Sequence, residues 1–151
     1  MADVAPRAVP PKAVPLLRWR VMLAYADSDA AGILYFAAWF PWMERMSTQA
    51  WLDRGFRHDR ILDQLGVQFV TRATTCDYLA VVRPYDEVDI EMDLAKAGRR
   101  SLQFAFTMTR VPDTTVVARA TFTLVCVDQS GRSTAVPPDV RTAFESSQCG
   151  Q

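Results

Sequence analysis

Apolar and polar side chains alternate along three consecutive stretches in the second half of the chain. The apolar positions of each stretch fall on one face: Val88, Ile90, Met92 and Leu94; Leu102, Phe104, Phe106 and Met108; Ala118, Ala120, Phe122, Leu124 and Cys126. A period of two is typical of a strand that buries one face and turns the other to water. Because the turns at residues 98–100 and 111–114 are short, the pattern predicts neighbouring antiparallel strands.

Two earlier stretches also predict strands, but they differ in how polar they are. Residues 18–25 alternate, with Trp19, Val21 and Leu23 on one face and arginines on the other. Residues 67–78 alternate poorly, because polar side chains interrupt the apolar positions: Arg72, Thr74, Thr75 and Asp77. A strand that is polar on both faces is typical of a place where two subunits, or a subunit and a ligand, meet.

The segment from about Phe36 to Arg54 follows a helical pattern. Its first half is apolar at most positions, which predicts a buried helix that a sheet wraps around. Gly55 suits the left-handed position after a helix, whereas Pro41 predicts either a later start or a bent first turn. The order of one strand, one long helix and four strands predicts an α+β fold, an antiparallel sheet wrapped around one long central helix.

The length of 151 residues suits one domain, which we expect over residues 16–146. Residues 1–15 are rich in proline and lack a packing face, so they predict a disordered tail. Residues 147–151 are expected to form a flexible C-terminus. Residues 138–146 predict a short helix, and residues 56–66 a short helix or a loop.

The composition gives no reason to expect several kinds of partner. The formal net charge of +0 gives no reason to expect nucleic acid. No apolar run approaches the roughly 20 residues that span a bilayer, so no membrane partner is expected. The three cysteines form no C-x-x-C pair, and we expect a reducing, cytoplasmic setting.

The chain lacks the residues that several kinds of catalytic site require. The chain has no G-x-S-x-G motif, which argues against a serine hydrolase of the nucleophile-elbow type. His58 is the single histidine and is expected to be exposed in a loop, so a Ser-His-Asp triad or a zinc site of several histidines is not available. No Gly-rich phosphate loop occurs, and we expect no cofactor and no metal.

Carboxylates are the remaining candidates for chemistry. Asp27 and Asp29 lie in an acidic turn just ahead of the predicted helix. The start of a helix offers free backbone N–H groups and a positive dipole end, so an acid there is suited to reaction at a carbonyl. The alternative is that both aspartates only shape a turn or cap the helix. Glu44, further along the helix, is a second candidate acid.

Residues 27–36, DSDAAGILYF, resemble the D-x-D-x-x-G-[IV]-[VL]-[YWF]-[YFH] signature of hotdog-fold acyl-CoA thioesterases. The similar group is the 4-hydroxybenzoyl-CoA thioesterase type, which includes the bacterial acyl-CoA thioesterases associated with the Tol–Pal system. The sequence WMER at residues 42–45 is also similar to their helix. The resemblance covers roughly residues 18–144, and it implies a hotdog fold and the hydrolysis of an acyl thioester.

The resemblance also implies roles for residues of the loop. Asp29 matches the catalytic aspartate, which either attacks the thioester carbonyl or activates a water, while Asp27 is expected to hold the loop. Backbone N–H groups around Tyr35 and Phe36 are expected to hold the thioester oxygen as it gains negative charge. Gly32 lets the backbone approach the substrate. Many relatives have histidine where this chain has Phe36, so any role of that histidine is absent.

Substrate binding is assigned to aromatic and basic side chains. Tyr35, Trp39 and Trp42 are candidates for an acyl pocket, and the alternative is that they belong to the core. Arg99 and Arg100 lie on a predicted hairpin where similar proteins place basic residues near the phosphates of coenzyme A. A solvated turn is the alternative for these two arginines.

We therefore expect a thioesterase that acts on an acyl-CoA or an acyl carrier protein, assembled as a homodimer or homotetramer. Two other classes of function stay open. One is a biosynthetic hotdog protein acting on carrier-bound polyketide intermediates, and Asp29 argues only against the subset that lacks the catalytic acid. The other is a non-catalytic acyl-binding module.

Overall fold

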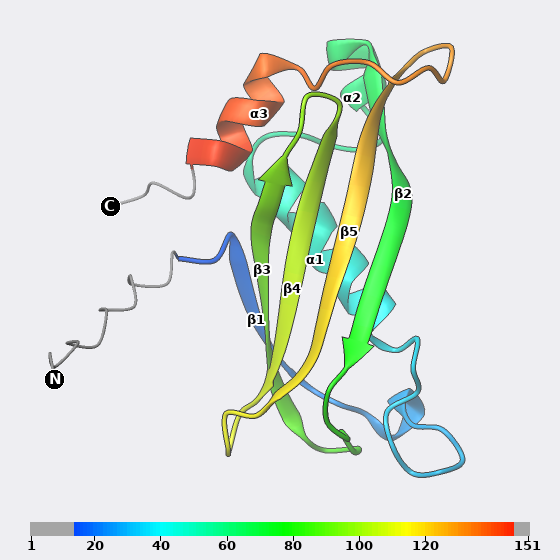
Figure 1. The fold of residues 1–151 in the computed structure, drawn as a ribbon, viewed down its shortest axis with the longest axis vertical. Coiled ribbons are helices and arrows are strands. Elements are labelled where there is room, and N and C mark those ends of the chain that lie inside the picture. Colours follow the sequence, from blue (N-terminus) through cyan, green and yellow to red (C-terminus); the bar gives the residue numbers. More distant parts are fainter. Residues whose placement is uncertain (1–13, 147–151) are drawn as a thin grey trace, which may run out of the picture.

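The computed structural model describes residues 14–146, and within them five strands form one antiparallel sheet (Figure 1). The strands are β1 (Leu17–Met22), β2 (Val67–Tyr78), β3 (Glu87–Ala97), β4 (Ser101–Arg110) and β5 (Val116–Asp128). Their order is β1-β3-β4-β5-β2, which confirms the predicted antiparallel sheet. The predicted tail, up to residue 13, and the predicted flexible end at residues 147–151 lie outside the described residues.

The three central strands follow the alternation that predicts them. Val88, Ile90 and Met92 of β3 are all fully buried, while the residues between them are partly exposed. In the register of the sheet, Ile90 lies opposite Met108 of β4, and other large apolar pairs follow on the same face. Neighbouring strands thus present one continuous apolar face, on which the core is built.

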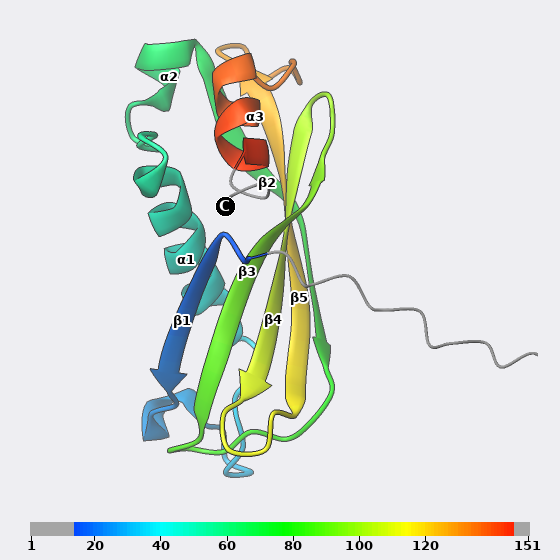
Figure 2. The same ribbon diagram turned by 90° about the vertical axis from the view of Figure 1, so that its left-hand side faces the viewer.

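The helix α1 (Trp39–Asp53) lies across that apolar face, as two perpendicular views show (Figures 1 and 2). Its buried side chains recur mostly every three or four positions: Trp39, Met43, Met46, Ser47, Ala50 and Trp51. This spacing places them on one stripe of the helix. The predicted central helix is therefore confirmed, although within the single chain the sheet covers it from one side only.

The predicted start of this helix, at about Phe36, is wrong by three residues. Phe36 belongs to a turn, and the first helical residue is Trp39. Pro41 is consequently the third residue of α1, where a backbone N–H has no acceptor within the helix to lose. The later start is thus the alternative that the structure confirms. At the other end, Gly55 has a φ of +85° just after the C-cap Arg54, as predicted.

Two short helices complete the fold. They are α2 (Ile61–Leu65) and α3 (Pro138–Glu145), which confirm the short helices expected near these positions. The side chain of Arg141 in α3 donates to the carbonyls of Ala97 and Gly98, so the helix is tied to the β3–β4 hairpin. In the described part of the chain, no helix is both long and apolar enough to cross a membrane.

Trp51 joins four parts of the chain around one ring. It is 0% exposed, and its ring centroid lies 4.7 Å from that of Phe69, 4.8 Å from Phe144 and 6.0 Å from Phe56. These partners come from β2, α3 and the segment after α1. The indole Nε1–H has no hydrogen-bond partner among the described residues. Trp51 therefore contributes to the core by packing alone.

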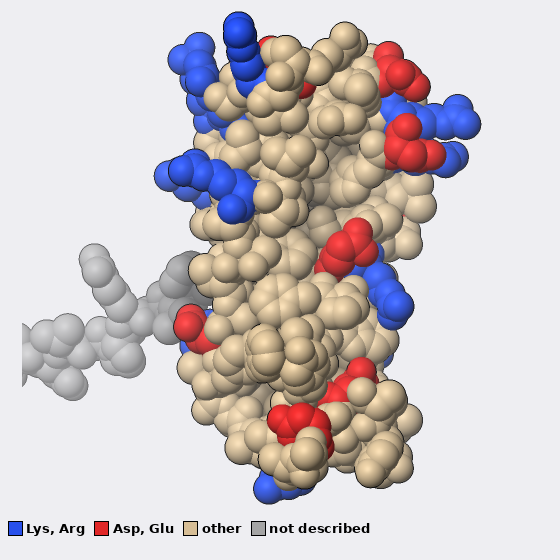
Figure 3. Space-filling view, turned by 90° about the vertical axis from the view of Figure 1, so that its right-hand side faces the viewer, with Lys and Arg blue, Asp and Glu red and all other residues tan. Residues whose placement is uncertain are grey.

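The strand β2 forms one edge of the sheet, because within the described residues it pairs only with β5. Residues 70–75 are exposed on both faces of this strand. Figure 3 views the molecule from this side, where uncharged surface covers much of the centre and most Lys and Arg side chains project from the upper half. An edge with unpaired backbone groups is a template for pairing with another chain.

Candidate active site

Asp27 closes the loop that leads from β1 to α1. Its carboxylate accepts the N–H of Ala24 at 2.8 Å, and its carbonyl accepts the N–H of Tyr35 at 2.7 Å. These two bonds hold the beginning and the end of the loop to the same residue. The expectation that Asp27 holds the loop is therefore confirmed.

Asp29 lies at the tip of this loop with one carboxylate oxygen engaged and the other open. Its Oδ1 accepts the N–H of Ala31 at 2.8 Å, and its carbonyl accepts the N–H of Gly32 at 3.0 Å. Gly32 has a φ of +73°, which favours glycine and lets the turn stay this tight. Oδ2 has no hydrogen-bond partner among the described residues. The carboxylate thus shapes the turn and still presents an oxygen for chemistry.

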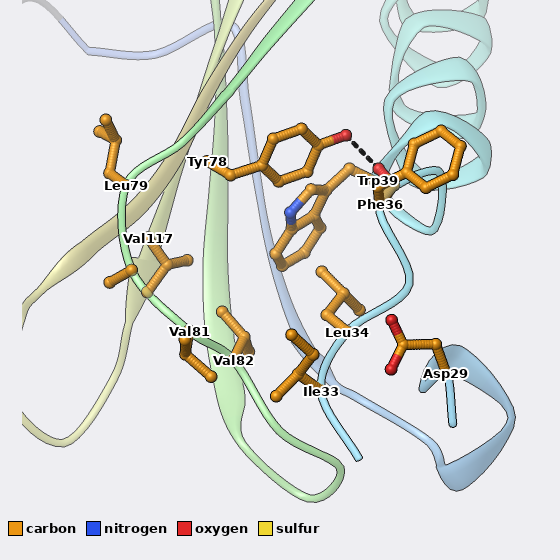
Figure 4. Close-up of a pocket in the computed structure, with 11 residues that line it drawn as sticks. Asp29, Ile33, Leu34, Phe36, Trp39, Tyr78, Leu79, Val81, Val82 and Val117 are labelled. Atoms are coloured by element: carbon orange, nitrogen blue, oxygen red, sulfur yellow. Dashed lines mark hydrogen bonds between the residues drawn. The ribbon is translucent and has the colours of Figure 1, made fainter. Parts of the chain in front are cut away.

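A cavity of about 380 Å³ opens beside Asp29. The loop contributes Ile33, Leu34 and Phe36 to its lining, and the helix contributes Trp39. The other wall consists of Tyr78, residues 79–82 and Val117. Asp29 is the one charged side chain among the described residues that line the cavity (Figure 4). An apolar cavity with a single carboxylate at its rim suits a ligand with an apolar body and one reacting group.

The expectation that both Tyr35 and Phe36 supply oxyanion donors is wrong for Tyr35. The N–H of Tyr35 is already bonded to the carbonyl of Asp27, because this bond closes the loop, and the side chain of Tyr35 does not line the cavity. The N–H of Phe36 has no acceptor among the described residues, while its carbonyl accepts the hydroxyl of Tyr78. Phe36 also precedes the helix by three residues, so the dipole of α1 does not begin at this N–H. One of the two expected donors therefore stays available.

Residues 24–144 match the sequence model of the thioesterase-like superfamily, a span that includes the acidic turn, α1 and the strands β2 to β5. The chain belongs to this family. It is 28% identical over 131 residues to a protein named acyl-CoA thioester hydrolase YbgC from Escherichia coli O6:H1, covering 86% of this chain and 96% of that relative.

Solved structures show the same fold at low sequence identity. A 1,4-dihydroxy-2-naphthoyl-CoA thioesterase from Synechocystis has a TM-score of 0.72 at 19% identity, covering 84% of this chain and 93% of that chain. A Staphylococcus aureus protein in complex with CoA has a TM-score of 0.78 at 15% identity, covering 89% of this chain and 84% of that chain. The family match and these structures confirm the predicted hotdog fold and the predicted class, a thioesterase.

Of the candidate residues on α1 of this thioesterase-like chain, one lines the cavity and two do not. Trp39 is 1% exposed and lines the cavity, so it belongs to both the core and the site. Trp42 is half-buried and packs against the core, but it does not line the cavity. Glu44 lies in the second turn, where its Oε1 accepts the hydroxyl of Thr48 at 2.8 Å. Of these three residues, Trp39 is therefore the one that lines the cavity beside Asp29.

Arg99 and Arg100 lie far from Asp29 in the single chain. They occupy the β3–β4 hairpin at one end of the sheet, whereas the acidic turn lies at the opposite end (Figure 1). Arg100 donates to Oγ of Ser133 at 3.1 Å, and the carbonyl of Arg99 accepts the N–H of Val136 at 2.9 Å. One chain therefore does not bring these arginines to its own cavity.

The sequence patterns do not identify the wall formed by Tyr78 and residues 79–82. These residues reach the cavity because β2 pairs with β5 and the chain then returns beneath the loop, with the N–H of Leu34 donating to the carbonyl of Val82 at 2.8 Å. One signal is present in the sequence. The run Leu79-Ala80-Val81-Val82 is apolar without alternation, directly after a polar strand.

His58 is exposed in the loop after α1, as predicted, but its ring has a defined contact. The ring centroid lies 5.1 Å from that of Trp51, in an edge-on arrangement. Burial on this side lowers the pKa of His58, because the charged form loses solvation. His58 does not line the cavity beside Asp29. Among the described residues, no group of three or more His, Cys, Asp and Glu is placed to hold a metal ion.

Proposed function

We propose that this protein hydrolyses the thioester of an acyl-CoA, with Asp29 acting at the thioester carbonyl. The observation that carries this proposal is the open carboxylate oxygen of Asp29 at the rim of an apolar cavity. The names of similar proteins support the substrate class, since the Escherichia coli relative is called an acyl-CoA thioester hydrolase and a structural neighbour was solved with CoA. The acyl group would occupy the cavity while the pantetheine arm leaves past Asp29.

Two routes to hydrolysis fit this arrangement. In the first, Asp29 accepts a proton from a water whose oxygen bonds to the carbonyl carbon; the C–S bond then breaks, and the thiolate takes up the proton. In the second, Asp29 itself bonds to the carbonyl carbon and expels the thiolate, and water then hydrolyses the mixed anhydride. In both routes the N–H of Phe36 would donate to the carbonyl oxygen as it becomes negative, and one such donor contributes about 3 kcal/mol.

A thiol-release assay tests the proposal. Acyl-CoAs and the same acyl groups on an acyl carrier protein are offered in parallel, and free thiol is measured over time. We expect release from acyl-CoA. Release only from carrier-bound polyketide intermediates would support the biosynthetic alternative, and tight binding of acyl-CoA without any release would support the acyl-binding module.

We further propose that Arg99 and Arg100 contact the phosphates of coenzyme A. Because they lie at the opposite end of the sheet from Asp29, they would serve the cavity of a second subunit. Arg suits this role because its planar fork of donors matches phosphate oxygens. The main chain of the hairpin is also held, since the N–H of Gly98 donates to the carbonyl of Ser101 at 2.8 Å.

Changing both arginines to alanine is expected to raise KM for acyl-CoA about tenfold, with a smaller change in kcat, because a remote contact contributes equally to substrate and transition state. Steady-state kinetics with acyl-CoA and with the matching acyl-pantetheine give the comparison. The acyl-pantetheine lacks the nucleotide phosphates and is expected to respond little. An equal response of the two substrates would contradict the phosphate contact.

We propose that the active form is a homodimer or homotetramer in which the β2 edge is covered. The exposed edge of β2 and the exposed apolar side chains beside the cavity support this, with Phe36 at 63% and Val81 at 47%. Light scattering of active protein is expected to give at least twice the chain mass of 17.0 kDa. A mass near that of one chain would refute the assembly.

A further inference from the structure

Tyr78 connects the sheet to the loop that carries the acidic turn with Asp29. It is the last residue of β2, and its hydroxyl donates to the carbonyl of Phe36 across the cavity (Figure 4). The two residues are 42 positions apart, and this bond is the direct polar contact between them. The ring itself is 49% exposed, so it lies at the border of the cavity and not in the core.

Tyr78 also borders two hollows. The cavity beside Asp29 has a volume of about 380 Å³, and a second hollow of about 410 Å³ lies next to it at the edge of the sheet. Tyr78 and Leu79 line both hollows, whereas Asp29 lines only the first. These two residues therefore lie where the two hollows adjoin, and we call them the wall.

This wall lies away from the reacting group. Figure 4 shows Asp29 and Leu79 on opposite sides of the cavity, with the ring of Tyr78 spanning from β2 toward Phe36. An acyl group whose carbonyl lies at Asp29 would pass Ile33 and extend toward the wall. The cavity volume is near the lower end of the roughly 300–1,000 Å³ of ligand sites, so the wall limits the acyl group to a short chain or a single ring.

We propose that Tyr78 determines the length of the acyl group that this protein accepts, an inference that rests on the thioester hydrolysis proposed above. With the hydroxyl bonded to Phe36, the ring closes the cavity. When the ring is removed, the cavity is no longer bounded at this end and longer chains gain room.

The closing bond is insensitive to pH in the range of ordinary assays. Burial of the hydroxyl, together with the adjacent Cys76, raises the pKa of Tyr78 to about 12. The hydroxyl therefore keeps its proton and remains a donor. A length limit set by Tyr78 should consequently be the same at neutral and at moderately alkaline pH.

Chain-length profiles test this role. The ratio of kcat/KM for hexadecanoyl-CoA to that for butanoyl-CoA is measured for the wild type, Tyr78→Ala, Tyr78→Phe and Leu79→Ala. We expect Tyr78→Ala to raise the ratio about tenfold or more, because single methylenes in an apolar pocket already change selectivity by about that factor. Leu79→Ala opens the same wall without touching the hydrogen bond and should also raise the ratio. Tyr78→Phe keeps the ring and should fall between Tyr78→Ala and the wild type.

Tyr85→Ala is the matched control, because Tyr85 is 70% exposed and lines neither hollow. It should leave the ratio within about twofold of the wild type, well below the effect of one methylene. If Tyr78→Ala and Leu79→Ala lower kcat/KM equally for all chain lengths, Tyr78 has only a structural role and the inference is overturned.

A binding experiment separates this inference from the proposed hydrolysis. S-butyl-CoA and S-hexadecyl-CoA carry a thioether that cannot be hydrolysed, and calorimetry gives their Kd for each variant. A lower Kd of S-hexadecyl-CoA for Tyr78→Ala, in a protein that releases no thiol from any thioester, would support the length limit and refute hydrolysis. If the variants release thiol while the length profile and the ratio of the two Kd values stay unchanged, hydrolysis is supported and the length limit is refuted.

Discussion

The variant Asp29→Asn is expected to lose turnover by at least about a hundredfold while its fold, its assembly and its affinity for acyl-CoA are kept. The amide oxygen of Asn can still accept the N–H of Ala31, so the turn before Gly32 remains. The amide cannot act as a base or as a nucleophile toward the thioester carbon. Single-turnover thiol release measures the loss, and calorimetry with a non-hydrolysable S-alkyl-CoA measures the affinity.

Two further carboxylate variants identify the residue responsible. Asp27→Asn should lower stability by about 1 kcal/mol, because a charged acceptor for the N–H of Ala24 becomes a neutral one, and it should reduce turnover less. Glu44→Gln should leave turnover close to the wild type. If Asp29→Asn keeps more than roughly a tenth of the turnover while Glu44→Gln abolishes it, the helix glutamate carries the chemistry.

The largest expected effect on stability comes from Trp51→Ala, which should cost about 3–5 kcal/mol in the free energy of unfolding. The indole is 0% exposed and packs against rings from β2, α3 and the segment after α1, so its removal leaves a cavity where several elements meet. Urea unfolding followed by far-UV circular dichroism, at one fixed protein concentration, measures the change.

Trp51→Phe is the matched control. It keeps an aromatic ring and removes an N–H that has no partner among the described residues, so no hydrogen bond is lost. We expect it to cost less than half as much as Trp51→Ala. An equal loss for the two variants would contradict the packing role assigned to the ring.

The sheet could be predicted from the sequence because its signal is local. Each of β3, β4 and β5 alternates along its own length, and the buried face follows from that alternation alone. The start of α1 could not be predicted from a local pattern, because the aromatic run that includes Phe36 and Trp39 is compatible with a turn as well as with a helix. Pro41 was compatible with both, since the first helical turn tolerates proline.

The residues of the candidate site also differ in whether a local pattern identifies them. Asp29 was identified from a contiguous motif, together with Gly32, whose positive φ the turn requires. Tyr78 was not, because it reaches Phe36 only through the pairing of β2 with β5, a long-range arrangement that a local pattern does not contain. Arg99 shows the converse, since the resemblance places it beside the phosphates of coenzyme A, while the fold places it on the β3–β4 hairpin, at the opposite end of the sheet from the acidic turn.

The segment of residues 79–82 is held in place by its backbone. The N–H groups of Leu79 and Ala80 donate to the carbonyl of Val117, at 2.8 and 3.2 Å, and the carbonyl of Val81 accepts a bond from the guanidinium of Arg110 at 2.9 Å. None of these anchors depends on which side chain the segment carries. Leu79 and Val81 are also exposed, at 51% and 47%, so substitutions at these two positions can accumulate with little penalty to folding, and descendants of this gene could acquire new acyl preferences by drift in two codons.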